Sequence, residues 1–217
     1  MPKKRLSQEE RRTQIIEVAM ALFASKGFKG TTTRAIAKQA DVSEAIIFRH
    51  FATKEDLYDA IINYTIEQRQ KLWDEEEAPV GPDQDLKSLL KEFAWTFIQR
   101  NREDQTFIRL MLYSALEDHK FREKFFAIYQ NPQIRAIREV LSIGVEKGLF
   151  RPMDHPFVAR SFLWILIQYC ISNFVANNTP PDSDEDKRNI DELVNIYVLG
   201  LESSSGETSL TDEKSRS

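Results

Sequence analysis

The chain has 217 residues, of which 41% are hydrophobic and 29% are charged, with only 7 glycines and 8 prolines. A chain of this length and composition can bury a core and form one large domain or two small ones. The scarcity of glycine and proline argues against a turn-rich all-β fold. The net charge of −4 is, at first sight, wrong for a protein that binds nucleic acid.

The net charge hides an asymmetry along the chain. Residues 1–54 carry 11 Lys and Arg against 5 Asp and Glu, a net charge of +6, whereas residues 55–217 carry 19 against 29, a net charge of −10. A basic N-terminal segment on an acidic body predicts that one end of the protein meets a polyanion.

Helical periodicity runs through almost the whole chain, and no segment shows sustained period-2 alternation. Ser7 and Glu10 form a capping box at the start of the first helix, and Gly27 is expected to end it. Three more helices follow, over 31–40, 43–51 and 53–73.

A segment with prolines and a glycine at 75–83 precedes the remaining helices. Their apolar spacing places them over 86–98, 104–112, 121–129, 133–147, 154–176 and 190–201. The sequence therefore predicts an all-α fold of about nine helices. Residues 203–217, rich in Ser, Glu, Thr and Lys, are expected to form a disordered tail.

Cysteine and histidine usage points away from disulfide and metal chemistry. The single cysteine, Cys170, cannot form an intrachain disulfide, which favours a reducing, cytoplasmic setting. His50, His119 and His155 do not have the spacing of metal ligands, so we expect no metal and no cofactor.

No membrane or export segment is expected. The basic start of the chain has no apolar run behind it, unlike a signal peptide. The longest apolar stretch, 157–176, is interrupted by Arg160, Gln168 and Asn173. It therefore predicts a buried or interface helix rather than a membrane span.

The most informative segment is 33–52, where two short helices flank a tight turn at 41–43. The apolar positions that can pack these helices together are Ile36, Ala37, Ala40, Val42 and Ile47. This is the arrangement of a helix-turn-helix, whose second helix, 44–50, can enter the major groove of DNA. An ordinary antiparallel helix pair shares these apolar positions, so the basic charge around the motif carries much of the distinction.

Side chains able to contact DNA surround this motif. The candidates for phosphate contact are Thr32, Thr33, Lys38, Ser43, Arg49, His50 and Lys54. Lys3, Lys4 and Arg5 form a basic arm that can reach phosphates or a minor groove; a solubilising tail has the same composition.

Several spacings occur together in this region. They are Phe23-(x)3-Gly27, Thr31-Thr32-Thr33, Ile36-Ala37, Ala40-Asp41-Val42-Ser43, Ile47-Phe48-(x)2-Phe51 and Lys54-Glu55-(x)-Leu57. With them the sequence resembles the TetR family of bacterial transcriptional regulators, over about residues 11–58.

The resemblance implies a homodimer with a small N-terminal DNA-binding domain, here 1–54, and a larger ligand-binding and dimerisation domain, here 55–202. It implies that an effector in the larger domain shifts the spacing of the two DNA-reading helices. It also implies that the last two long helices, near 157–176 and 185–201, form a four-helix bundle with those of the partner. The alternative is that both belong to the core of the monomer.

Carried over position by position, the resemblance gives two groups of DNA-contacting residues. Thr33, Ser43, His50 and Lys54 are expected near phosphates, and Arg34, Glu44, Ala45 and Arg49 near base edges. Glu44 could accept a hydrogen bond from a cytosine amino group, and Arg34 or Arg49 could bind guanine.

Two positions depart from the family pattern. Asp41 stands where the family has glycine, and aspartate tolerates the left-handed turn better than most residues. Phe48 stands where the family has tyrosine, so it cannot donate the phosphate hydrogen bond and is expected only to pack.

Residues 55–217 hold ten Phe, three Trp and six Tyr, most of them expected in the core. An effector pocket needs concave apolar walls with a few polar groups. The candidates, each of which core packing would also explain, are Phe93, Phe97, Phe107, Met111, Phe126, Tyr129, Trp164 and Gln168. Gln168 is the best polar candidate because it interrupts an apolar run; a hydrogen bond across a dimer interface is its alternative role.

The sequence thus predicts a ligand-responsive transcriptional regulator in the cytoplasm. It is expected to be a repressor that binds a palindromic double-stranded DNA operator as a homodimer and is released by a small apolar or amphipathic effector. No phosphate-binding loop, nucleophile elbow or paired-carboxylate motif occurs, so we expect no enzymatic activity. The alternative is a helix-turn-helix dimer without a small-molecule ligand, acting as an activator or architectural factor.

Overall fold

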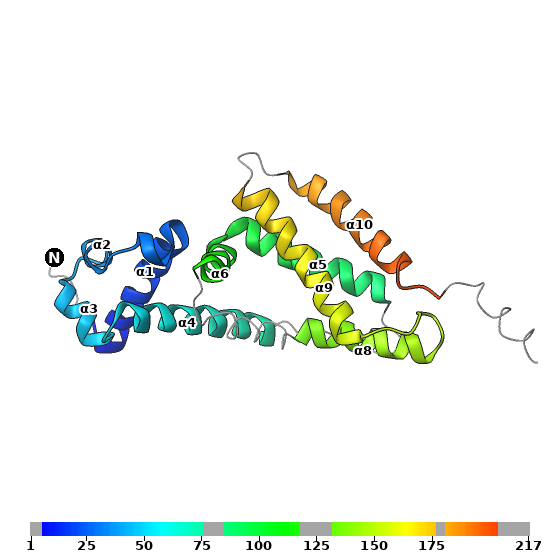
Figure 1. Cartoon of the computed structure of the whole chain (residues 1–217), viewed down its shortest axis with the longest axis horizontal. Helices are drawn as coiled ribbons and strands as arrows, with labels where there is room; N and C mark the ends of the chain where they lie inside the picture. The colour runs from blue at the N-terminus through cyan, green and yellow to red at the C-terminus, as the bar shows by residue number, and fades with distance from the viewer. Residues whose placement is uncertain (1–5, 76–84, 118–131, 177–180, 204–217) are drawn as a thin grey trace, which may run out of the picture. The chain divides into compact units, whose positions relative to one another are not determined.

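The structure, a computed structural model, describes residues 6–75, 85–117, 132–176 and 181–203 (Figure 1). Within them the chain forms nine α-helices, one π-helical segment and no β-strand, apart from an isolated bridge between Phe150 and Glu202. The all-α fold is therefore confirmed. The helix expected over 121–129 lies outside the described residues, as do the tail after 203 and the basic arm at Lys3, Lys4 and Arg5.

The helices gather into two compact units that interleave along the sequence. The head unit, as we call it, combines residues 1–77, 100–131 and 170–178, and the body unit combines residues 78–99, 132–169 and 179–217. The expected functional boundary near residue 54 stays a prediction, because compactness does not test where DNA binding ends.

In the head unit the first four helices are α1 (Gln8–Gly30), α2 (Thr33–Gln39), α3 (Glu44–His50) and α4 (Lys54–Glu75). The capping box at the start of α1 is present. The Ser7 amide donates to the Glu10 carboxylate at 2.7 Å, and the Glu10 amide donates to the Ser7 hydroxyl at 3.1 Å. The apolar face of α1, which includes Ile15 and Phe23, is buried and packs on α4 and α6 (Thr106–Leu116).

Gly27 breaks α1 but does not end it. Its φ of 71° lies in the left-handed region, and one further turn follows to Gly30. A Cβ at this position would lie 2.8 Å from Cδ1 of Tyr113 and 2.9 Å from a carboxylate oxygen of Glu117, both on or next to α6. Glycine is therefore required here both by the backbone and by the close approach of α6.

The extra turn after Gly27 is held by polar contacts. The Glu117 carboxylate accepts hydrogen bonds from the amides of Phe28 at 2.8 Å and Lys29 at 3.3 Å. The Thr31 hydroxyl donates to the carbonyl of Gly27 at 2.8 Å. These bonds fix the start of the segment that leads into α2.

The body unit contains most of α5 (Leu86–Glu103), α8 (Pro132–Glu146), most of α9 (His155–Cys170) and α10 (Ser183–Leu199). Its core includes Phe162, whose ring lies 6.4 Å from that of Phe93 and 5.0 Å from that of Tyr197. A fully buried carboxylate, Asp186, accepts hydrogen bonds from Gln99 at 3.1 Å and Tyr169 at 2.8 Å. This polar contact ties α5, α9 and α10 together.

The long apolar helix is less regular than its sequence suggests. The α-helix ends at Cys170, and a π-helical segment, η2 (Ile171–Val175), follows instead of α-helix to residue 176. The last helix begins at Ser183, several residues before its apolar stripe, because Asp182 caps it by accepting from the amides of Asp184 and Glu185. Within the described residues, one stretch, His155–Val175, could span a membrane by length and composition alone.

Candidate DNA interface and effector cavities

The helix-turn-helix packs around a small apolar core. Ile36 and Ala37 of α2, Ala40 of the turn and Ile47 of α3 are buried, so the two helices are held together as the sequence predicts. Asp41 has a φ of 55°, the one positive value outside glycine in the described part of the chain. The left-handed turn expected at this aspartate is therefore confirmed.

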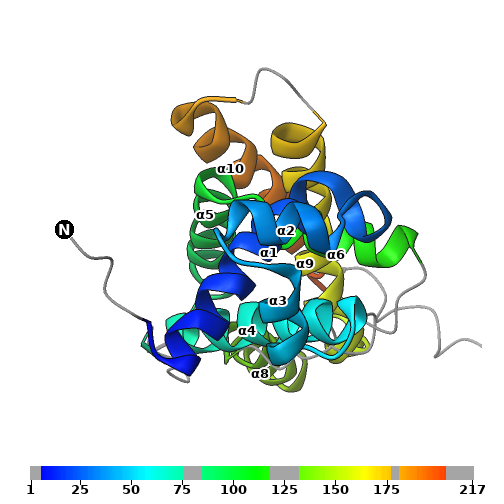
Figure 2. The same cartoon turned by 90° about the vertical axis from the view of Figure 1, so that its left-hand side faces the viewer.

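The outward face of α3 is formed by Ala45, Phe48 and Arg49, which are all exposed. Residues three and four apart lie on the same side of a helix, so these three form one continuous surface. Figure 2 views the end of the head unit that carries α2 and α3.

Phe48 is only partly buried. It leaves 47% of its surface exposed, whereas Ile47, one position earlier, is buried. One residue corresponds to about 100° of rotation around a helix, so a side chain next to the buried Ile47 can point outward. About half of the Phe48 surface is thus covered within the protein, and its expected role in packing stays a prediction.

Two of the residues predicted to contact DNA, Thr33 and Glu44, are hydrogen-bonded to each other. The Thr33 hydroxyl, at the start of α2, donates to the Glu44 carboxylate, at the start of α3, at 2.7 Å. This bond holds the half-buried Glu44 against α2. It also uses the hydroxyl proton that Thr33 would offer to a phosphate, although the Thr33 oxygen and the other Glu44 oxygen can still accept.

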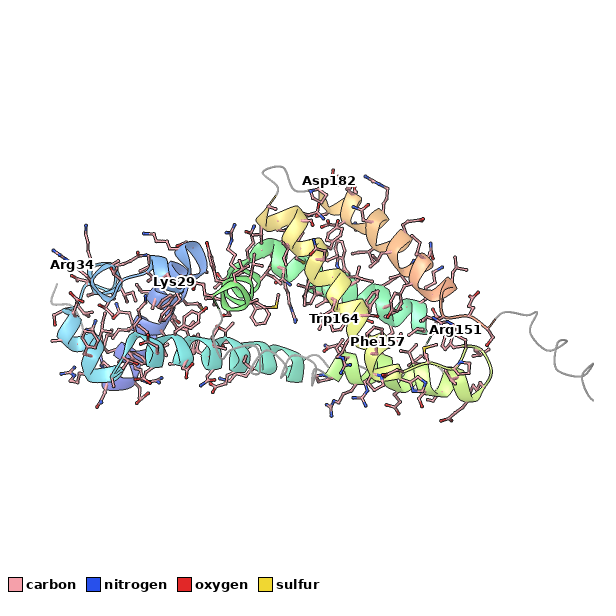
Figure 3. All side chains as sticks on the ribbon, viewed as in Figure 1. Lys29, Arg34, Arg151, Phe157, Trp164 and Asp182 are labelled. Atoms are coloured by element: carbon pink, nitrogen blue, oxygen red, sulfur yellow. The ribbon has the colours of Figure 1, made fainter. Side chains whose placement is uncertain are left out.

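Three cations around α3 are exposed and have no ion pair within the described residues. They are Arg34 and Lys38 of α2 and Arg49 of α3. Figure 3 shows Arg34 projecting away from α2. Nothing in the described protein competes with a polyanion for these side chains.

The remaining predicted hydroxyl contacts differ in whether they form a helix cap. The Thr32 hydroxyl caps α2 by accepting from the amide of Ala35 at 3.1 Å. Ser43 occupies the N-cap position of α3, but its side chain makes no capping hydrogen bond and is exposed. Because the Thr32 oxygen only accepts in this cap, both hydroxyls keep a proton that can be donated to a phosphate.

His50 lies at the end of α3, half-buried, and its Nε2 atom is shielded from solvent without a hydrogen-bond partner in the described structure. Burial lowers the pKa of His50, and the charges of Arg49, Arg12 and Arg11 lower it further against the opposing charge of Glu9. The imidazole is therefore neutral at pH 7, and a phosphate contact through Nε2 requires the ring to rotate outward.

Lys54 has partners inside the protein. Its ammonium donates to the Phe28 carbonyl at 2.5 Å and lies 4.0 Å from the centroid of the Phe28 ring. Burial lowers the pKa of Lys54 from its usual value, although Glu55 and Glu117 oppose this shift. The side chain joins the start of α4 to the turn after Gly27.

Sequence reasoning missed the part played by Arg12. Its guanidinium lies 4.9 Å from the centroid of the ring of Phe51, the C-cap residue of α3, and so it links α1 to the end of α3. The adjacent basic residues Arg11 and Arg12 are visible in the sequence. The periodicity of the helix does not show, however, which of them lies over an aromatic ring of another helix.

A cavity of about 360 Å³ lies inside the head unit. Met20 of α1, Thr65 of α4 and Phe107 of α6 lie in its walls; the rest of the lining is Tyr64, Gln68, Arg100, Glu103, Asp104 and Thr106. The Thr65 hydroxyl donates to the carbonyl of Ile61 at 2.8 Å. Most of the wall surface is apolar, although the lining includes polar side chains and the charged groups of Arg100 and Glu103 at the end of α5.

A second cavity, of about 810 Å³, lies in the body unit. It is bounded by the start of α5, the end of α8, the turn at 147–150 and the end of α10, and Leu149 and Val198 are among its apolar walls. Gly144 lies beside it and is packed so closely by the Phe150 ring that a Cβ would come within 2.1 Å of that ring.

The predicted effector residues that the structure describes are divided between the two units. Phe93 and Phe97 are buried with their rings 6.0 Å apart, and Phe107 lines the head-unit cavity. Met111 is half-buried, whereas Trp164 and Gln168 are exposed on α9. Phe126 and Tyr129 lie outside the described residues. The part of the chain that the structure describes holds no group of three metal-ligating side chains.

An all-helical chain with this helix-turn-helix and exposed cations around its second helix has the features of an HTH-type transcriptional regulator. Residues 15–61 match the family model of the bacterial regulatory proteins of the tetR family, so the helix-turn-helix region is similar to that of this family. Relatives of the chain include transcriptional regulators and a nucleoid occlusion factor, and these relatives are not enzymes.

Two curated relatives match most of the chain. The HTH-type transcriptional regulator YvkB of Bacillus subtilis is 27% identical over 190 residues, covering 87% of this chain and 95% of its own. The HTH-type transcriptional repressor KstR2 of Mycobacterium tuberculosis is 25% identical over 172 residues, covering 73% of this chain and 80% of its own.

The fold is shared with solved structures. The transcriptional regulator FadR of Bacillus subtilis, solved in complex with stearoyl-CoA, superposes with a TM-score of 0.68 over 87% of this chain and 98% of its own. The two sequences are 18% identical, so the superposition shows a common architecture.

Proposed function

We propose that the protein is a ligand-responsive repressor that binds a palindromic DNA operator as a homodimer. The observation that carries this proposal is the exposed face of α3, flanked by Arg34, Lys38 and Arg49 without ion pairs in the described residues. Phosphate contacts fix the position of a reading helix, and side chains on its outer face then meet base edges. The repressor KstR2 supports the expected sign of regulation.

In the proposed complex each protomer places α3 in one major groove. Two-fold symmetry then requires two half-sites about 34–36 Å apart, or a multiple of this spacing, on one side of the duplex. The proposed phosphate contacts are Thr32 and Ser43, together with Thr33 once its hydroxyl leaves Glu44 and His50 once its ring turns outward. Lys54 reaches a phosphate only if its ammonium leaves Phe28. Arg34, Glu44, Ala45 and Arg49 are the proposed base contacts.

We propose that α9 and α10 form the dimer interface. On α9 the exposed aromatic residues Phe157 and Trp164 lie two turns apart with their rings 5.9 Å apart, and the polar Gln168 follows one turn later (Figure 3). On α10, Ile196 and Leu199 leave 63% and 66% of their surfaces exposed. Apolar stripes of this kind on two helices are expected to be covered by a partner.

For the effector we propose the cavity of the head unit. A molecule in it touches Met20 of α1 and Phe107 of α6 at once, so it can bias how α1 packs. Its volume lies within the usual range for small-molecule sites. By linkage, an effector that prefers the conformation with lower DNA affinity releases the operator. The stearoyl-CoA complex of FadR supports an effector with an apolar part.

DNA binding is tested by enriching duplexes from a random library with the full-length protein and measuring the affinity of the enriched sequence by fluorescence anisotropy. The expected result is a palindromic site whose affinity falls steeply with salt. Arg49→Ala should change the preference among sites, whereas Lys38→Ala should weaken binding to all of them. Absence of sequence-selective, salt-sensitive binding would overturn the proposal.

Effector binding is tested by a thermal-shift screen of aromatic, amphipathic and acyl-CoA compounds, because a ligand of the folded state raises its melting temperature. Gln68→Trp narrows the head-unit cavity and should abolish a shift caused by binding there. Leu149→Trp, at the body-unit cavity, is the matched control. If no compound shifts the protein or releases DNA, the ligand-free alternative is favoured. If only Leu149→Trp abolishes the ligand-induced shift in melting temperature, the proposed effector site is wrong.

A further inference from the structure

The outward face of α3 contains no neutral hydrogen-bonding side chain. Ala45 and Phe48, one turn apart, form an apolar strip beside the guanidinium of Arg49. Glu44 is half-buried and bonded to Thr33, so it stands behind this strip rather than on it. The exposed outward face that a groove meets therefore consists of two apolar groups and one cation, with Glu44 at its N-terminal edge.

The apolar strip is costly in the free protein. Phe48 leaves 47% of its surface in water, and neither a ring contact nor a polar contact engages it within the described residues. Burial of that surface against DNA is favourable only where the DNA itself is apolar, since a phenyl ring can neither donate to a phosphate nor satisfy a base N–H or carbonyl.

The major groove offers one apolar group, the C5 methyl of thymine. We propose that Phe48 is a specificity-determining residue that recognises thymine through this methyl group, with Ala45 leaving room for the ring to approach. Arg49, next to it on the same face, reads a neighbouring guanine. This inference rests on the proposed placement of α3 in the major groove and states which base that helix selects.

The test uses the full-length protein and the site enriched from the random library. Each thymine is replaced in turn, in both half-sites, by deoxyuridine, which removes the methyl and leaves every hydrogen-bonding group in place. At one thymine position the substitution should weaken binding of the unaltered protein about fourfold per half-site, because this is the change in affinity expected when one buried methyl group is lost. For Phe48→Ala the same substitution should change nothing.

Phe48→Leu and Phe48→Tyr serve as further variants, and their melting temperatures show that they are folded. Phe48→Leu keeps an apolar contact and should retain part of the thymine preference. The proposal is overturned if no thymine methyl affects binding, or if the effect persists undiminished in Phe48→Ala. It is also overturned if Phe48→Tyr tightens binding to all sequences and removes the thymine effect, since the ring then faces the phosphate backbone.

The outcomes separate this inference from the proposed function. Selective binding without any methyl effect refutes the role of Phe48 and leaves the DNA-binding proposal standing. Absence of any selective binding refutes both.

Discussion

Replacing Lys54 by alanine tests how the basic residues of the head are used. The side chain follows the helix-turn-helix directly and was expected to contact phosphate, yet its ammonium donates to the Phe28 carbonyl and lies 4.0 Å from the Phe28 ring centroid. If these contacts persist in the complex, Lys54→Ala acts chiefly on the stability of the fold.

The magnitude follows from those two contacts. A hydrogen bond from a charged donor contributes about 1.5–3 kcal/mol, and a cation–π contact at an exposed site about 0.5–1 kcal/mol. Because Lys54 is half-buried and solvent screens part of both interactions, we expect a loss of about 2 kcal/mol in the free energy of unfolding. For a chain of this size that corresponds to a fall in Tm of about 4–8 °C.

Lys38→Ala is the matched control. Lys38 is exposed and has no ion pair in the described structure, so its removal should leave the Tm unchanged. Removing one phosphate-binding cation from each protomer should instead flatten the salt dependence of DNA binding, by about 1.8 in the slope of log affinity against log salt.

The assays are thermal unfolding of the free proteins and anisotropy titrations with the enriched DNA between about 50 and 200 mM salt, a range that includes the physiological ionic strength. The reasoning is refuted if Lys54→Ala keeps the Tm of the unaltered protein and lowers the salt slope as much as Lys38→Ala does. In that case the ammonium leaves Phe28 for a phosphate when DNA binds.

Three other predictions concern pH, backbone conformation and assembly. Burial, Arg49 and Arg12 lower the pKa of His50, so at pH 7 the free protein holds a neutral imidazole. Because phosphates favour the protonated form, DNA affinity should rise as the pH falls from 8 to 6, with uptake of up to one proton per protomer on binding. The stability of the free protein should fall as the pH drops below about 6.5, since the unfolded chain then binds more protons; His50→Gln should remove both effects, and an unchanged pH profile would contradict them. Gly27 and Gly148 share a φ of 71°, but an added Cβ would meet Tyr113 only at Gly27. Chemical denaturation should therefore show a loss in the free energy of unfolding of about 1 kcal/mol for Gly148→Ala and about 2–4 kcal/mol for Gly27→Ala. Equal losses would exclude a steric role for α6. Ile196→Asp should convert the dimer to monomer in light scattering without unfolding the protomer, and a dimer that survives it would exclude the outer face of α10 as the interface.

The local features of the head could be predicted from the sequence because they depend on residues close together in the chain. The capping box of Ser7 and Glu10 spans four residues, and the left-handed turn at Asp41 is a property of one residue with its neighbours. The apolar spacing around Ile36 and Ile47 likewise reports which faces of two adjacent helices meet. Short-range chemistry was sufficient for each of them.

The contacts that decide the roles of individual polar residues join parts of the chain that are farther apart in sequence. The bond from Thr33 to Glu44 joins two helices, and the Glu117 carboxylate reaches the amide of Phe28 across 89 positions of the chain. Periodicity gives the buried face of each helix but not which polar group on it finds which partner. For the same reason the apolar run of α9 did not show that Trp164 lies on its exposed side.

These internal partners change what the basic charge of the head implies. If all 11 Lys and Arg of residues 1–54 contacted phosphate, the salt slope of a dimer would be about 20. Arg11 donates to Gln14, Arg12 lies over Phe51 and Lys54 is held by Phe28, so these three are engaged within the protein.

Arg34, Lys38 and Arg49 are the exposed cations around α3. If all three met phosphates in both protomers the slope would be about 5, and it is smaller to the extent that Arg34 and Arg49 bind base edges, as proposed. A slope of about 5 or less that is unchanged when residues 1–5 are deleted assigns phosphate binding to the helix-turn-helix itself. A steeper slope that falls on this deletion assigns the excess to Lys3, Lys4 and Arg5. The net charge of the head therefore sets only an upper limit on its phosphate contacts.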